Sequence, residues 1–433
     1  MVRIAAGELH RSLSDPVLDA MALLNEIAAR HPSAVSFAPG WPAEDPFELA
    51  DVDRYLRHYA RYLEEERGFS ANDVRDRLFR YGPAAGIIRE LVVRHLAADE
   101  GMRVDPASVL VTVGCQEALI VVLRTLFDDP RDVLLVQSPC YFGISGAARL
   151  LDIEIVPVPE SEAGLRPARV AEIAAQVRAS GRRPRALYVI PDFANPSGLT
   201  LPVEAREALL DVAAAEDLLV LEDNPYGFYS RFDRRMPTLK SLDRRGQVIY
   251  LGSFSKTCAP GVRVGYLVAD QEVHRSDGRR SLLAEELTKV KSMITVNTSP
   301  ITQSIVAGML VAGGFALRDA NAGRVAEVAD RMNVLLAEVR AKLTPIRDRA
   351  TEISWTEPDG GFFVVIRLPF RVDAEALEES AARFGVLWTP MSLFYQEGGD
   401  HELRLSASHA DPDQIRLGVD RLAKFIEHRL DTA

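Results

Sequence analysis

The chain has 433 residues, of which 47% are hydrophobic and 26% charged, and its formal net charge at pH 7 is -11. This balance is typical of a globular protein, and a chain of this length usually forms two domains. The acidic charge and the lack of a basic tract disfavour a nucleic-acid surface. No apolar run approaches the roughly 20 residues of a membrane span, and residues 1–15 lack a signal-peptide core, so we expect a cytoplasmic protein.

The cysteine pattern disfavours both disulfides and metal. The three cysteines, Cys115, Cys140 and Cys258, stand far apart, and an odd number at wide spacing is not typical of a disulfide framework. No group of cysteines and histidines has the spacing of metal ligands. We expect free, buried thiols and no metal.

The predicted elements begin with an amphipathic helix before His31, a loop rich in proline and glycine at 36–46 and a charged helix at 52–66. From about 87 to 267, apolar runs of four to six residues recur, with helical stretches between many of them. Short apolar strands between helices predict a mostly parallel sheet that is covered on both faces. The predicted strands are 109–113, 133–137, 153–158, 186–190, 218–221, 248–251 and 264–268.

The last part of the chain follows a different pattern. Two helical stretches flank a break at 297–300, and a long helix is predicted at about 324–343. Strands and helices then mix, which predicts a second, smaller α+β domain. We expect an N-terminal arm and loop at 1–50, a large domain at 51–315 and a small domain at 316–433. The predicted elements of the small domain are strands at 353–356, 362–367 and 403–407 and helices at 374–384 and 412–429.

The sharpest motif is Ser253-Phe254-Ser255-Lys256, which follows the predicted strand at 248–251 and precedes Arg263 by seven residues. In an extended segment the two serines lie on the same side. Hydroxyls and a guanidinium suit a phosphate, and a partly desolvated lysine suits an aldehyde. Taken alone, the motif is equally well explained as a surface lysine beside a serine-rich turn.

Polar residues also follow two neighbouring predicted strands. Asn195 comes after the run at 186–190, and Asp223 and Tyr226 come after the run at 218–221. Ligands of open α/β sheets bind beyond the carboxyl ends of the strands. An acidic residue there would suit a pyridine nitrogen, and a tyrosine would donate to a phenolic oxygen. Each turn alone is also typical of an ordinary strand end.

Three weaker signals complete the set. A turn at Gly114 precedes a helix start at Gln116, where free N–H groups and the helix dipole favour a phosphate. Tyr141 follows another strand, and its ring would stack on a planar ligand. Arg404 stands in an otherwise apolar strand and suits a bidentate carboxylate, although a structural salt bridge is the alternative.

In their order along nearly the whole chain, these motifs resemble the class I and II aminotransferases of pyridoxal 5'-phosphate (PLP) fold type I. The resemblance implies an α/β fold with a mostly parallel seven-stranded sheet and a smaller α+β C-terminal domain. It implies transfer of an amino group between an L-amino acid and a 2-oxo acid by a ping-pong mechanism, with PLP as cofactor. It also implies a homodimer with shared active sites.

The resemblance assigns a role to each site residue. Lys256 would be the Schiff-base lysine and proton shuttle, and Asp223 would pair with the pyridinium nitrogen. Asn195 and Tyr226 would bind the phenolic oxygen, and Arg404, with Gly40 and Asn195 close by, would hold the substrate carboxylate. The other expected cofactor contacts are Ser253, Ser255, Arg263, Gly114 and the backbone of Cys115 and Gln116 at the phosphate, Tyr141 at the ring, and Tyr81 reaching the phosphate of the neighbouring subunit.

A closer resemblance is to the hydroxyphenylglycine and dihydroxyphenylglycine aminotransferases of antibiotic pathways. It is carried by segments 8–19, 36–40, 296–300 and 387–391, whereas Phe193 and Ala194 depart from it. We see no second arginine for a distal carboxylate, so an aromatic, arylglycine or aliphatic substrate is favoured. Candidate apolar lining residues, each with ordinary core packing as the alternative, are Phe37, Trp41, Phe142, Phe228, Trp388 and Phe394.

Three other classes of protein are alternatives to this interpretation of the sequence. A PLP-dependent lyase, decarboxylase or synthase would share the fold and the cofactor contacts. A transcription regulator with an aminotransferase-like domain would need a helix-turn-helix domain, and the residues before position 36 are too few for one. A binding protein without activity is disfavoured by the intact set of lysine, aspartate, asparagine and arginine.

Overall fold

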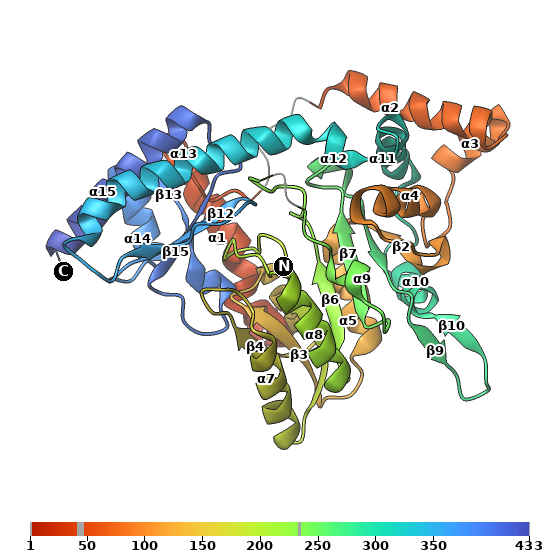
Figure 1. Ribbon diagram of the computed structural model, residues 1–433, viewed down its shortest axis with the longest axis horizontal. Helices are drawn as coiled ribbons and strands as arrows, with labels where there is room; N and C mark the ends of the chain where they lie inside the picture. The colour runs from red at the N-terminus through yellow and green to blue at the C-terminus, as the bar shows by residue number, and fades with distance from the viewer. Residues whose placement is uncertain (1, 41–46, 233–234, 433) are drawn as a thin grey trace.

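The structure is a computed structural model, and it describes residues 2–40, 47–232 and 235–432. Its centre is a seven-stranded sheet with the strand order β2-β8-β7-β6-β5-β3-β4 (Figure 1). Strands β3, β4, β5, β6 and β7 pair in parallel, whereas β8 is antiparallel to both of its neighbours, β2 and β7. The mostly parallel sheet predicted from the sequence is therefore confirmed. The strands are β2 Val109–Thr112, β3 Asp132–Ser138, β4 Glu154–Pro159, β5 Arg183–Val189, β6 Leu219–Asp223, β7 Val248–Ser253 and β8 Gly265–Val268.

Helices cover both faces of this sheet, which explains why its strands read as continuous apolar runs. All seven residues of β3 are buried. Leu134 and Val136 face a core shared with α5 (Gly114–Leu126), α6 (Phe142–Leu150) and α10 (Leu283–Ile294). The alternate residues Val133 and Leu135 face the opposite core. That second core is built with α7 (Pro167–Ala179), α8 (Val203–Ala215) and α9 (Leu239–Leu242).

A third core covers the edge of the sheet formed by β2 and β8. Its helices include α2, α3, α4 and α11, and it buries Val109 and Val111 of β2 with Tyr266 and Val268 of β8. An antiparallel hairpin, which the sequence patterns did not predict, projects nearby. The elements are α2 Leu49–Arg61, α3 Ala71–Phe79, α4 Arg89–Glu100, α11 Pro300–Ala312, α12 Leu317–Ala320, and the hairpin strands β9 Glu272–His274 and β10 Arg280–Leu282.

The smaller part of the molecule is built on an antiparallel sheet with the order β11-β12-β15-β14. Its core contains residues of the long helix α13 (Ala322–Arg347), of α14 (Ala374–Glu379) and of α15 (Pro412–Thr432). In place of the single helix predicted at 374–384, the structure has the shorter helix α14 followed directly by a π-helical turn at Ser380–Phe384. The strands are β11 Ser354–Trp355, β12 Phe363–Arg367, β14 Thr389–Pro390 and β15 Glu402–Ser406.

The N-terminal segment packs on this smaller sheet. β1 (Val35–Ser36) pairs in parallel with β13 (Val386–Leu387). Phe37 and Ile27, the latter from α1 (Pro16–Arg30), belong to the core of the small domain. Helix α1 lies beside the small sheet and also contacts α6 of the large domain (Figure 1).

Helix α13 connects the two parts of the molecule. Val328, near its beginning, belongs to the core of the large sheet. Met332 and Leu335, further along, belong to the core of the small sheet. Among the described residues, no helix is long and apolar enough to cross a membrane, and no group of three or more potential metal ligands occurs.

Candidate active site

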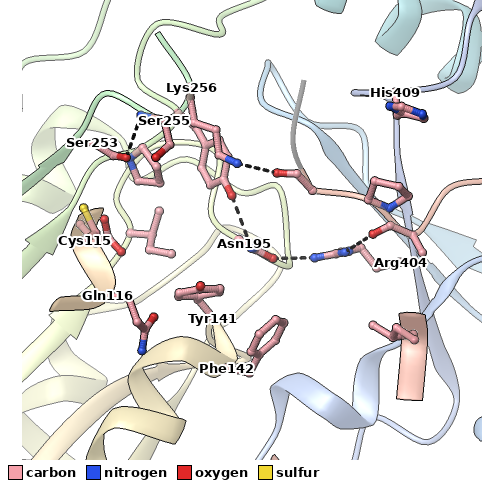
Figure 2. Close-up of a pocket in the computed structure, with 18 of the residues that line it drawn as sticks. Cys115, Gln116, Tyr141, Phe142, Asn195, Ser253, Ser255, Lys256, Arg404 and His409 are labelled. Carbon is pink, nitrogen blue, oxygen red and sulfur yellow. Dashed lines mark hydrogen bonds between the residues drawn. The ribbon is translucent and has the colours of Figure 1, made fainter. Parts of the chain in front are cut away.

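A cavity of about 590 Å³ lies where the strands of the large sheet end, opposite β15 of the small sheet. The predicted site residues converge on it from separate elements. Asp223 ends β6. Ser253 ends β7, and Arg404 comes from β15 on the other side of the cavity (Figure 2). The predicted residues that line it are Gly40, Cys115, Gln116, Tyr141, Asn195, Asp223, Tyr226, Ser253, Ser255, Lys256, Arg263 and Arg404.

Two predicted residues do not line the cavity. Gly114 lies directly beside Arg263, because a Cβ atom at Gly114 would stand 2.5 Å from Nη2 of that arginine. Tyr81 lies on the surface with 88% of its area exposed. A role for Tyr81 at a neighbouring subunit's site therefore stays a prediction.

Lys256 enters the cavity from the turn that follows β7. Its Nζ atom donates a hydrogen bond to the main-chain oxygen of Gly40 at 2.9 Å (Figure 2). Burial, together with the positive charges of Arg263 and Arg404, lowers the pKa of Lys256 to about 8. A lysine with this pKa is partly neutral near physiological pH, and the neutral amine is the form that attacks a carbonyl carbon.

Asp223 fits a protonated ring nitrogen. Its Oδ2 atom accepts a hydrogen bond from the hydroxyl of Tyr188 at 2.6 Å. Its Oδ1 atom is buried and has no hydrogen-bond partner among the described residues. Burial raises the pKa of Asp223 to about 6. A cationic N–H group at Oδ1 would satisfy this orphaned oxygen and stabilise the carboxylate.

Tyr188 is a site residue that the sequence reasoning missed. It lies on β5 and is only 1% exposed. The signal was present, because a tyrosine inside an otherwise apolar strand needs a partner for its hydroxyl. The partner could not be chosen from the sequence, since the pairing of β5 with β6 decides which side chains meet.

Arg404 lies at the far end of the cavity in a polar chain of contacts. Its Nη1 atom donates to Oδ1 of Asn195 at 2.8 Å, and Nδ2 of Asn195 lies 3.4 Å from the hydroxyl of Tyr226. The guanidinium carbon lies 4.3 Å from the ring centre of Phe363 and 4.8 Å from that of Phe394. Burial lowers its pKa to about 10, so the group stays charged at neutral pH.

The alternative of a structural salt bridge at Arg404 is not seen. Its Nη2 atom donates to the main-chain oxygen of Ala38 at 2.9 Å and to the hydroxyl of Thr389 at 3.2 Å. Within the described residues its Nε atom is buried without a partner, and no carboxylate pairs with the guanidinium. A buried cation with one unsatisfied donor fits a carboxylate ligand.

The opposite end of the cavity suits a phosphate. The N-terminus of α5 begins at Gly114, which has a φ of 73°. Arg263 also adopts a left-handed conformation, with φ of 50°, and its Nη1 atom donates to the hydroxyl of Ser255 at 3.2 Å. A helix N-terminus, a guanidinium and serine hydroxyls together favour a dianion. Burial raises the pKa of Cys115, so this residue adds no negative charge there.

Aromatic rings form one wall between these two ends. The ring centres of Tyr141 and Phe142 are 5.0 Å apart, and those of Phe142 and Phe394 are 5.6 Å apart. Burial raises the pKa of Tyr141 to about 12, so its hydroxyl stays neutral. A planar ring bound between Asp223 and the phosphate end would lie against Tyr141.

The apolar lining residues proposed from the sequence divide into two groups. Phe142 lines the cavity. Phe37 and Trp388 do not, because both are fully buried in the core of the small domain. Phe228 packs against a core of the large domain, and Phe394 packs against Phe142 without lining the cavity itself. Trp41 is outside the described residues.

The sequence did not single out several residues that also line the cavity. Leu24, Asn25 and Ala28 of α1, Ser36 of β1 and His409 after β15 all line it. No local pattern marks these residues, because they reach the cavity only through the pairing of β1 with β13 and the packing of α1 on the small domain.

The fold and this site define a PLP-dependent enzyme of fold type I. The residues present fit the cofactor at each of its groups: an amine for the aldehyde, an orphaned carboxylate oxygen for the ring nitrogen, and a cradle of donors for the phosphate.

Comparison with known proteins identifies the family. The family described as Aminotransferase class I and II matches residues 65–422. The chain is 44% identical to (S)-3,5-dihydroxyphenylglycine transaminase of Amycolatopsis orientalis over 429 residues, which is 99% of this chain and 96% of that relative. The crystal structure of an archaeal alanine:glyoxylate aminotransferase has a TM-score of 0.83 at 26% identity, with 99% of this chain and 100% of that chain covered.

A further solved structure is the α-aminoadipate aminotransferase LysN of Thermus thermophilus, complexed with N-(5'-phosphopyridoxyl)-L-leucine. Its TM-score is 0.78 at 28% identity, with 99% of this chain and 100% of that chain covered. The chain belongs to the class I and II aminotransferases, and it is a PLP-dependent enzyme that transfers amino groups from amino acids. These findings favour transamination over the lyase, regulator and binding-protein alternatives.

Proposed function

We propose that this aminotransferase acts on an arylglycine, with a hydroxylated phenylglycine or its 2-oxo acid as the preferred substrate, in the biosynthesis of a specialised metabolite. The observation that carries the proposal is the 44% identity to a (S)-3,5-dihydroxyphenylglycine transaminase over 99% of the chain. An arylglycine has its ring directly on the α-carbon, so its side chain is short, planar and uncharged.

The composition of the cavity supports an uncharged side chain. Among its described lining residues, the lysine and arginines are Lys256, Arg263 and Arg404. The first would bind the aldehyde of the cofactor, the second the phosphate and the third the α-carboxylate, so no fixed cation is left for a distal carboxylate. Phe142 and Leu24 offer apolar surface to a ring, and Asn25 offers an amide to ring hydroxyls.

The mechanism assigns each group one task. Bound PLP supplies an aldehyde that condenses with amines and a protonated ring that withdraws electrons. Lys256 would hold the cofactor through its amine, and the same amine, when free, would take and return the proton at the substrate α-carbon. Asp223 would pair with the ring nitrogen and keep it protonated. Arg404 and Asn195 orient the substrate by its carboxylate, which fixes the bond that loses the proton.

We also propose a homodimer in which Tyr81 reaches the partner's site. Tyr81 is followed by Gly82, which lies close to Asn297 and Pro300, so the two loops are neighbours. The second loop and the helix before it expose Val296 by 56% and Met293 by 84%. An apolar surface of this kind beside Tyr81 supports contact with a second copy.

An absorbance experiment tests the substrate proposal. The purified protein with PLP should show a band near about 420 nm that converts to one near about 330 nm when an amino donor is added. We expect 3,5-dihydroxyphenylglycine or 4-hydroxyphenylglycine to convert it faster than phenylalanine, leucine, aspartate or 2-aminoadipate. Fastest conversion by a dicarboxylic amino acid would contradict the substrate class, and no band after addition of PLP would contradict the proposed cofactor site.

A further inference from the structure

The main-chain oxygen of Lys256 is bound from two sides. It accepts a hydrogen bond from the hydroxyl of Tyr229. The Nη1 atom of Arg324 lies 3.4 Å from the same oxygen and 3.5 Å from the main-chain oxygen of Cys258. Within the turn itself, the N–H of Cys258 donates to the oxygen of Phe254 at 2.8 Å. Two side chains from distant parts of the chain therefore fix the turn that carries the lysine.

Tyr229 is attached to the small domain. Its main-chain oxygen accepts a hydrogen bond from the N–H of Gly361 at 2.7 Å. Its ring lies edge-on to that of Phe362, with the ring centres 4.7 Å apart. Gly361 and Phe362 directly precede β12, which begins at Phe363. The hydroxyl is buried with the rest of the side chain, which is 2% exposed. Burial also raises the pKa of Tyr229, so it remains a donor.

Arg324 is attached to the small domain through α13. It stands in the first turn of that helix, where the helix dipole disfavours a cation. The helix dipole therefore does not explain its position. The guanidinium points instead to the two carbonyl oxygens of the lysine turn and to Oδ1 of Asn321, at 3.0 Å from Nη1. Residues further along α13 pack in the core of the small sheet.

A third contact closes this arrangement. Arg231, two residues after Tyr229, donates from Nε and Nη2 to Oδ1 of Asn333 on α13 at 2.9 and 2.7 Å. Its N–H group donates to the oxygen of Asp359 at 2.8 Å. The segment that carries Tyr229 and the helix that carries Arg324 are thus joined to each other as well as to the small domain.

We infer that Tyr229 and Arg324 are positioning residues that hold the main-chain carbonyl of Lys256, so that the small domain sets where the lysine amine stands. The inference rests on the proposed role of Lys256 as cofactor-binding lysine and proton carrier. A carbonyl fixed at Lys256 fixes the Cα atom and the direction of the side chain. A proton carrier misplaced by about 1 Å can lose about 100-fold in rate.

The test uses Tyr229→Phe, which removes only the hydroxyl, with Tyr59→Phe as the control. Tyr59 lies on α2 in a core of the large domain, away from the cavity, and its hydroxyl accepts a hydrogen bond from Nε of Arg77, so this variant also removes a single hydrogen-bonded hydroxyl. Two quantities are measured. The first is the rate at which cofactor-free protein develops the absorbance band at about 420 nm when PLP is added. The second is the kinetic isotope effect on a single turnover with an amino donor that is deuterated at the α-carbon.

For Tyr229→Phe we expect slower development of the band, kcat lower by about 10-fold to 100-fold with little change in KM, and a larger isotope effect because proton transfer becomes limiting. Tyr59→Phe should change none of these by more than about twofold. Equal behaviour of the two variants would overturn the inference. So would a Tyr229→Phe variant that loses activity in proportion to a lower melting temperature, with the isotope effect unchanged.

Arg324 provides a second, independent variant pair. Arg324→Gln should show the same pattern, and Arg324→Lys should recover part of the rate because it keeps the charge near both carbonyls. Arg340→Gln is the matched control, since Arg340 lies on the same helix and pairs with Glu357 at the surface. If Arg324→Gln and Arg324→Lys both behave like Arg340→Gln, the inference is overturned for the arginine. If wild type itself neither binds PLP nor transfers an amino group, the proposed function fails instead.

Discussion

The hydroxyl of Tyr188 donates to one oxygen of Asp223 and leaves the other oxygen of the carboxylate free for the cofactor ring. The donor–acceptor distance is 2.6 Å, and the second oxygen is buried without a partner among the described residues. The hydrogen bond fixes the rotation of the carboxylate, so the free oxygen has one direction. Tyr188 is thus a support for the residue that keeps the ring protonated.

Removing the Tyr188 hydroxyl should weaken the binding of the cofactor ring by Asp223 while the negative charge of Asp223 stays. We expect Tyr188→Phe to lower affinity for PLP and to reduce kcat by roughly 10-fold, since one hydrogen bond to a charged group is worth about 1.5–3 kcal/mol. Cofactor titration by absorbance and steady-state kinetics measure the two effects. Unchanged affinity and kcat would show that Asp223 needs no support from β5.

Asp223 should destabilise the protein when the cofactor is absent. Its pKa rises from 3.8 to about 6 on folding because of burial. The folded protein then binds the proton more tightly than the unfolded chain, so stability from this group falls as pH rises from about 4 to about 6 and stays lost above that. Asp223→Asn should therefore raise the melting temperature of cofactor-free protein at pH 7.5, by an amount worth roughly 1–2 kcal/mol, and raise it little at pH 4.

With PLP bound, the sign should reverse. The ring nitrogen gives wild-type Asp223 a cationic partner, which the neutral amide of Asp223→Asn cannot match. The variant should then gain less in melting temperature on addition of PLP than wild type and should lose most of its transaminase activity. Melting curves with and without PLP at both pH values measure this, and an equal gain from PLP in the two proteins would argue against a ring contact at Asp223.

The lysine should control the pH dependence of cofactor binding. Burial and the charges of Arg263 and Arg404 lower the pKa of Lys256 to about 8, so the fraction of neutral amine rises through that pH. We expect the rate of band development by cofactor-free protein to rise with pH to a plateau, with its midpoint near 8. In Arg404→Gln one of the positive charges is gone, so the midpoint should move to higher pH. Lys256→Ala should develop no such band.

The large sheet and most of the site could be predicted because many of the site residues stand next to an apolar run. Asp223 ends a mostly buried strand, Asn195 and Lys256 follow such strands, and parallel strands bring their carboxyl ends to one edge. The local sequence therefore indicates both where a strand lies and which polar residues stand at its carboxyl end. The left-handed backbone of Arg263 was not predicted, yet it directs the guanidinium to Ser255.

Contacts between distant segments could not be predicted. The sequence does not reveal that Val35 pairs with Val386, and this pairing brings α1 to the cavity. Phe193 gives a second example. It departs from the arylglycine aminotransferase pattern, and in the structure it has a φ of 51° and packs in the core beside Gly360 and Gly361 instead of lining the cavity. The departure therefore concerns packing between the domains.

Arg404 gives the sharpest test of how substrate is held. Its planar guanidinium already binds Asn195 through Nη1, and its position between Phe363 and Phe394 fixes the plane in which a carboxylate can pair with it. Lysine keeps the charge but has neither the fork of donors nor the flat face. We expect Arg404→Lys to lower kcat/KM for amino acids by about 100-fold to 1000-fold, mostly through KM, while the band of bound PLP stays.

Arg367→Lys is the matched control for this variant. Arg367 lies on β12, next to β15, and pairs with Glu402 at the surface. It should keep the kinetic constants of wild type within about twofold, in line with the small contribution of exposed ion pairs. If Arg404→Lys also kept its kcat/KM, the carboxylate would have to be bound elsewhere. If it lost the PLP band instead, Arg404 would act on the cofactor through Asn195 and not on the substrate.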